Sequence, residues 1–162
     1  MIRVKLVVQV RLMPTPEVAS ALECTLRTAN DAANWLSGQA HERGETSRTA
    51  LQGFAYRDLK GRGLSAQPAL HVLRKVADAY TTLRANIRGG NLGRPGSKRR
   101  SRAEGKPIGF RPDAAQPYDD RCLSWQVDEQ TVSIWTTAGR LRGVRFICSE
   151  QAPRQAWPFR AG

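Results

Sequence analysis

The sequence predicts an α+β fold in which a split small β-barrel contains an inserted three-helix bundle. Three observations support this prediction. Residues 2–12 alternate apolar and polar side chains, residues 16–87 show helical periodicity, and residues 123–148 return to alternation. Because one long strand cannot bury its apolar face alone, we expect the first strand to pair with the late ones. The helices then interrupt a single sheet.

The first barrel strand, expected within residues 1–14, has one apolar and one basic face. Its even-numbered positions from Ile2 to Leu12 are all apolar. Successive side chains of a strand point to opposite sides, so Arg3, Lys5 and Arg11 share the other face. We therefore expect one face to pack on a core and the other to meet water or a polyanion.

Three helices are expected in a recognition-type insertion over residues 15–90, because apolar residues recur there at steps of three and four. The first runs from Pro16 to about Arg43 after an N-cap at Thr15. The second covers Ser47 to Lys60. The third follows Ser65 and ends at the glycine pair 89–90.

The next segment, residues 91–106, is expected to be a flexible basic linker. Basic residues dominate from position 84 to 111, where Glu104 is the only acid, and this stretch carries about two-thirds of the net charge of +12. Glycine, proline and serine interrupt it, so we expect its centre to lack fixed structure without a partner. The basic residues of the wider stretch from 84 to 111 are Arg84, Arg88, Arg94, Lys98, Arg99, Arg100, Arg102, Lys106 and Arg111.

The remaining barrel strands are expected over residues 107–149, followed by an irregular tail at 150–162. Alternation indicates strands near 123–127, 132–134 and 144–148, with a further short one at 108–110.

Composition favours some classes of function over others. A net charge of +12 and a pI near 10.8 favour a polyanionic partner, first of all nucleic acid. No helix combines a basic face with a large aromatic one, so a membrane surface fits less well. We find no signal peptide or membrane-spanning run and expect a soluble, cytoplasmic protein. Cys24, Cys122 and Cys148 are far apart, without a CxxC pair, and indicate free thiols.

Catalytic patterns are not recognisable, so we expect no enzyme activity, cofactor or metal. The adjacent acids at 119–120 and 128–129 fit turns, where neighbouring side chains diverge, rather than a two-metal site. His41 and His71 lie on expected helices without a nucleophile in a recognisable motif.

Residues suited to nucleic-acid binding are more evident than catalytic ones, because basic side chains neutralise phosphates and aromatic rings stack on unpaired bases. Trp125 shares the apolar phase of its strand and is expected in the core, whereas Trp135 lies on the opposite phase and is the better stacking candidate. Tyr56 and Trp157 are further candidates, and Trp35 is expected to pack. Asn34 and Gln67 are either polar reading groups or ordinary helix-surface residues. The expected nucleic-acid-binding residues are Arg3, Lys5, Arg11, Asn34, Gln67, Arg84, Arg88, Arg94, Lys98, Arg99, Arg100, Arg102 and Trp135.

Several short motifs occur in a particular order along the chain. They are R-L-M-P-T-P at 11–16, Asn30 with Asn34-Trp35, the helix pattern from Leu64 and Gln67 to Ala79-Tyr80, Gly93-Arg94-Pro95, and the late T-V-S-I and G-R-L segments. In this order they resemble the N-terminal lobe of the TnpB (OrfB) transposon-encoded RNA-guided nucleases, which are related to the type V CRISPR effectors.

The resemblance implies a wedge-type barrel and a recognition-type helical insertion, which together hold guide RNA and help read a motif beside target DNA. The family cuts with a RuvC-like domain, usually bearing a zinc ribbon, and neither part is recognisable here. The lead expectation is therefore a lobe that binds guide-type RNA, with DNA as a further candidate partner, and does not cleave by itself. The alternative is a subunit or fragment that docks on a separately encoded RuvC-like nuclease domain or self-associates.

Overall fold

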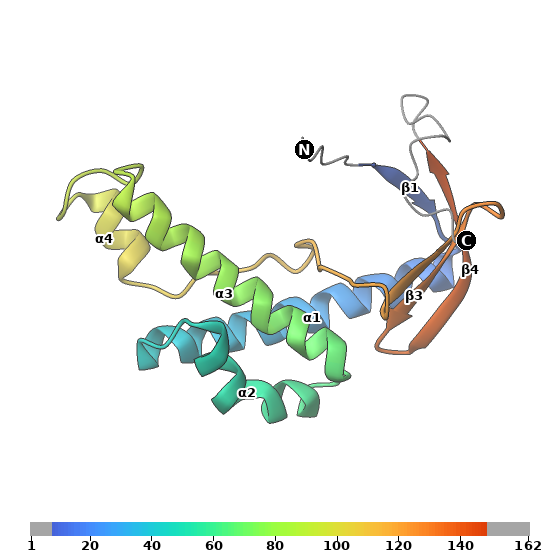
Figure 1. Cartoon of the computed structure of the whole chain (residues 1–162), viewed down its shortest axis with the longest axis horizontal. Coiled ribbons are helices and arrows are strands. Elements are labelled where there is room, and N and C mark those ends of the chain that lie inside the picture. The colour runs from blue at the N-terminus through green and yellow to red at the C-terminus, as the bar shows by residue number, and fades with distance from the viewer. Residues whose placement is uncertain (1–7, 149–162) are drawn as a thin grey trace, which may run out of the picture.

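The first helix links the two parts of the molecule. In the computed structural model, which describes residues 8–148, α1 (Pro16–Arg43) runs from the sheet into a helical lobe (Figure 1). Thr15 Oγ1 caps it by accepting a hydrogen bond from the Val18 N–H, and Gly44 ends it with a left-handed φ of 67°. The expected bounds of this helix are confirmed.

Two further helices complete the helical lobe, as predicted. Helices α2 (Arg48–Gly61) and α3 (Ala66–Arg88) pack with the second half of α1, and their apolar stripes meet in one core. The leucines of that core are fully buried, and burying each side chain contributes about 1.5–3 kcal/mol. They include Leu36, Leu51, Leu59 and Leu73.

An antiparallel sheet forms the other end of the molecule (Figure 1). Its strands are β1 (Val10–Met13), β2 (Leu123–Gln126), β3 (Thr131–Thr136) and β4 (Gly139–Cys148), in the order β1-β4-β3-β2. The predicted pairing of the first strand with the last is confirmed, with Val10 opposite Cys148. The inner face of the sheet packs against the N-terminal half of α1 through Val18 and Leu22. The α+β class is therefore confirmed, with the helices inserted between strands of one sheet.

The predicted barrel is not closed in the described part of the chain. Strands β1 and β2 are the two edges of the sheet and do not pair with each other. Four strands, two of them only four residues long, provide too little sheet to curl around and meet.

The expected linker and the expected short strand also differ from the structure. Helix α4 (Lys98–Glu104) forms within the segment expected to be flexible. Ser97 Oγ caps it at the Arg100 N–H, and Arg100 pairs with Glu104 one turn later at 3.0 Å. Residues 108–110 form no strand. Within residues 8–148, no helix is long and apolar enough to cross a membrane.

Candidate nucleic-acid interface

The segment from residue 81 to residue 106, which we call the basic arm, projects from the helical lobe. Tyr80 is the last buried residue of α3, and the helix continues for about two more turns to Arg88. None of residues 81–106 is buried. Figure 1 shows α4 and the end of α3 at the end of the molecule remote from the sheet. The arm therefore presents its side chains to solvent.

Most cations of the basic arm have no partner within the described residues. Arg84 donates hydrogen bonds to Thr46 and Thr81, and Arg100 is paired with Glu104. The remaining basic side chains are exposed and lie in no hydrogen bond or ion pair between residues 8 and 148. They are Arg88, Arg94, Lys98, Arg99, Arg102 and Lys106. Seven of the predicted binding residues thus gather in the basic arm.

Helix α4 carries its charges in an unfavourable arrangement. Lys98 and Arg99 occupy its first turn, which contains no acid, although the N-terminus of a helix already bears partial positive charge. Lys98 and Arg102 are also one turn apart, and like charges at this spacing repel. A seven-residue helix has little stability of its own. A bound polyanion would remove both penalties, so this arrangement fits a surface that binds phosphates.

Arg11 lies apart from the basic arm, on the outer face of the sheet. It is exposed and stands opposite Ile147, while its neighbour Met13 stands opposite Arg145. Met13 and Ile147 are 51% and 48% exposed. This face is therefore both basic and apolar. Arg3, Lys5 and Trp157 lie outside the described residues.

Asn34 joins α1 to the segment that returns from the basic arm to the sheet. Its Nδ2 donates to the Phe110 carbonyl at 2.9 Å, and its Oδ1 accepts from the Phe110 N–H at 2.7 Å. These two bonds satisfy both backbone groups of Phe110, as a neighbouring strand would, and tie this residue to α1. The polar residue singled out by the sequence therefore has a structural role here.

Asn30, one turn earlier, makes the buried half of the same clamp. It is fully buried, and its Nδ2 donates to the carbonyls of Pro112 and Ala114 at 2.9 Å each. Its Oδ1 accepts from Lys75 Nζ at 2.6 Å. Burial lowers the pKa of Lys75. We call Asn30 and Asn34 the asparagine clamp.

Replacing Asn34 with alanine should destabilise the fold by about 1 kcal/mol, because two solvent-exposed hydrogen bonds are lost. Any binding of RNA by the chain should keep its salt dependence, since the side chain faces the protein backbone. Urea denaturation and an RNA titration measure the two quantities. Asn34→Asp keeps the acceptor but loses the donor, so it should fall between wild type and alanine. Weaker RNA binding at unchanged stability would indicate a reading role instead.

The aromatic candidates have exposures opposite to those expected. Trp135 is half-buried and packs against the helical core, with its backbone bonded to Tyr118 and Cys122. Trp125 is 39% exposed, because β2 is an edge strand, and it meets Phe146 edge-on. The alternation along the strand predicted correctly which side of the sheet Trp125 lies on, but it did not predict how exposed the residue is.

The other candidates remain within the helical lobe. Gln67 is half-buried in the first turn of α3. The rings of Trp35 and Tyr56 are partly buried against the helical core and lie beneath Arg62 and Lys60. Neither Gln67 nor Trp135 belongs to the basic arm.

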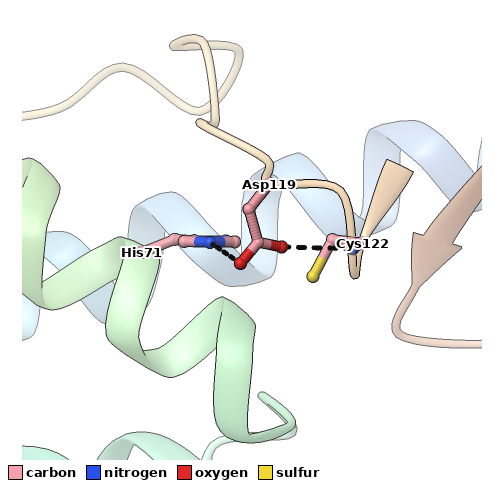
Figure 2. A group of neighbouring side chains, drawn as sticks. All are labelled: His71, Asp119 and Cys122. Atoms are coloured by element: carbon pink, nitrogen blue, oxygen red, sulfur yellow. Dashed lines mark hydrogen bonds and ion pairs between the residues drawn. The ribbon is translucent and has the colours of Figure 1, made fainter. Parts of the chain in front are cut away.

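A group that the sequence did not reveal lies where α3 meets the segment leading into β2. His71 Nε2 is 3.3 Å from Asp119 Oδ2, and Asp119 Oδ1 accepts from the Cys122 N–H at 3.2 Å (Figure 2). His71 and Cys122 are buried, at 7% and 3% exposure. The sequence placed Asp119 in a turn, which its bonds with the Cys122 N–H fit, but it did not predict the contact of Asp119 with His71. The D-x-x-C spacing at 119–122 was the only signal available.

The group shifts the ionisation of its members. Burial opposes the charge of Asp119, but the electrostatic interaction with His71 and hydrogen bonds from Cys122 and His71 outweigh it, so the pKa of Asp119 is lowered. Burial, and then the charge and hydrogen bonding of Asp119, raise the pKa of Cys122 to about 11. Burial also raises the pKa of the neighbouring Tyr118 to about 12.

In a metal-free protein at pH 8, Cys122 should resist a thiol reagent that labels Cys24. Only the thiolate reacts, and with a pKa of about 11 roughly one Cys122 in a thousand is ionised. Cys24 is exposed, whereas Cys122 is buried. Peptide mapping after brief labelling in a chelating buffer measures both sites. Labelling of the two cysteines at similar rates in folded protein would contradict this environment for Cys122.

No family model matches the chain, and neither the curated proteins nor the solved structures contain a significant match to it.

Proposed function

We propose that the protein binds nucleic acid, with RNA as the preferred form, through the basic arm. The observation that carries this proposal is the set of exposed cations on residues 81–106 that have no acidic partner within the described residues. Such side chains bind phosphates and release counterions, which gives affinity with little sequence discrimination.

We further propose that this binding serves a TnpB-like system, in which the helices act as the recognition insertion and the open sheet takes the place of the wedge barrel. The supporting observation is the shared order of elements, with the first and last strands paired around the inserted helices. In this proposal the protein acts in the cytoplasm, holds guide-type RNA and can also meet target DNA.

Cleavage by this chain forms no part of the proposal. Two-metal nucleases need several carboxylates around their ions. Within residues 8–148, the group of side chains close enough to share a metal ion is His71, Asp119 and Cys122, which contains one carboxylate.

A titration of the full chain with a fluorescent RNA hairpin, repeated at several salt concentrations, tests the proposed function. About five phosphate contacts, each contributing about 0.7 on a single strand and about 0.9 on a duplex, would give a slope of log affinity against log salt of roughly −3.5 to −4.5. Weak binding with a slope near zero would overturn the proposal. Duplex DNA of the same length in parallel tests the preference for RNA.

The outer face of the sheet favours a second candidate function, assembly with a protein partner. Met13 and Ile147 are exposed beside Arg11 and Arg145. The outer edges of β1 and β2 are not paired with any strand within residues 8–148, so another strand could bind there. A second copy of the chain is the simplest partner to test. Light scattering at about 100 μM should then show a dimer that is lost in a Met13→Ser, Ile147→Ser variant, whereas a monomeric wild type would contradict self-association.

A further inference from the structure

His71, Asp119 and Cys122 form a compact set of metal-ligand types from two parts of the fold. His71 comes from α3, whereas Asp119 and Cys122 come from the turn before β2 (Figure 2). One donor atom from each residue lies within 4.8 Å of the others. In a tetrahedral zinc site with bonds of 2.0–2.3 Å, the donor atoms lie about 3.3–3.8 Å apart. Shifts of roughly 1 Å would therefore bring the three donors to one ion.

The imidazole of His71 is available for coordination. Its Nε2 faces Asp119, and its Nδ1 is buried without a hydrogen-bond partner in the described part of the chain. Neither ring nitrogen is thus committed to a hydrogen bond outside the group. Coordination would use Nε2, the nitrogen that already faces the carboxylate.

The chemistry of the three donors identifies the class of ion. A thiolate and an imidazole beside one carboxylate suit Zn²⁺, whereas Mg²⁺ and Ca²⁺ prefer sites made only of oxygen. The thiolate and carboxylate together balance the double charge of the ion.

We propose that His71, Asp119 and Cys122 bind one Zn²⁺ ion at the junction between α3 and the turn that leads into β2. Cys122 releases its thiol proton to solvent on binding, and a water molecule takes the fourth position of the ion. The ion joins the helical lobe to the sheet, where the His71–Asp119 pair otherwise makes that connection.

Titration of the chelator-treated full chain with Co²⁺ tests this site, because cobalt reports both its ligands and its geometry by absorption. We expect one Co²⁺ per chain, with a thiolate charge-transfer band and the visible bands of a tetrahedral ion, and displacement of both by Zn²⁺. Absence of a thiolate band in the folded wild type would overturn the proposal, whatever the variants do.

Variants then assign the ligands. Cys122→Ser should remove the thiolate band and weaken Zn²⁺ binding by more than about 100-fold, since loss of a mere second-shell partner already costs 10- to 100-fold. Asp119→Asn is a milder change, because Asp119 is partly exposed, and it should keep the thiolate band but weaken Zn²⁺ binding. This variant tests the site even if Cys122→Ser does not fold. Cys24→Ser and His41→Gln are matched controls outside the group and should change neither quantity. Loss of the band in Cys24→Ser or Cys148→Ser would place the metal elsewhere and contradict the site.

Discussion

Replacing Lys98, Arg99 and Arg102 with glutamine should weaken RNA binding at least about tenfold at physiological salt. All three side chains are exposed on α4 and have no acidic partner between residues 8 and 148. Each contact to single-stranded RNA contributes about 0.7 to the salt slope, so the slope should flatten by roughly 2. Fluorescence anisotropy at several salt concentrations gives both numbers.

Folding should not suffer from these three replacements. No residue of α4 is buried, and removing like charges from its first turn relieves the helix. The thermal midpoint should therefore stay within a few degrees of the wild type. A fall in RNA affinity at unchanged stability then reports on the interface alone.

A triple variant of equal charge change provides the control. Arg48 and Arg57 of α2 and Arg74 of α3 are exposed and lie outside the basic arm. Their replacement by glutamine lowers the net charge by the same amount. If binding depends only on total charge, both triple variants will lose the same affinity, and the basic arm is then not the interface.

Asn30→Ala should destabilise the protein by about 3 kcal/mol or more. The change leaves the carbonyls of Pro112 and Ala114 without their donor and the Lys75 ammonium without one acceptor. Each unsatisfied group in a buried position costs about 1–3 kcal/mol, and a charged group costs more. The midpoint of urea denaturation measures the loss.

Asp31→Ala is the matched control for Asn30→Ala. Asp31 is the next residue of α1 and is exposed, so its replacement should change stability by no more than about 0.5 kcal/mol. If Asn30→Ala costs as little as this control, the asparagine clamp does not hold the return segment.

Local patterns predicted the elements of this fold well. The bounds of α1 followed from Thr15 and Gly44, which act as caps through their own backbone and side-chain chemistry. The three late strands followed from alternation, and their pairing with the first strand followed from its need to bury an apolar face. The signals for the single helices and strands lie within a few residues of the structure that they specify, whereas the pairing of β1 with β4 joins residues 10 and 148.

Features that depend on distant contacts were harder to predict. The exposure of Trp125 depends on β2 being an edge strand, which strand phase does not show. Asn34 holds Phe110 from 76 residues away, and His71 meets Asp119 only after the insertion has folded against the sheet. The Ser97 cap and the Arg100–Glu104 ion pair of α4 can both be read from the sequence. The surrounding glycines and charges nevertheless led to the prediction of a flexible linker there.

Hydrogen–deuterium exchange of the full chain, with and without a saturating RNA hairpin, tests the central claim most directly. Binding at the basic arm predicts slower amide exchange across α4 and the last turns of α3, because a polyanion stabilises a helix with cations in its first turn. The backbone amides of β1 and β4 should exchange at the same rate with and without RNA. Protection confined to these two strands, or no protection of residues 94–106 under saturating RNA, would contradict the account.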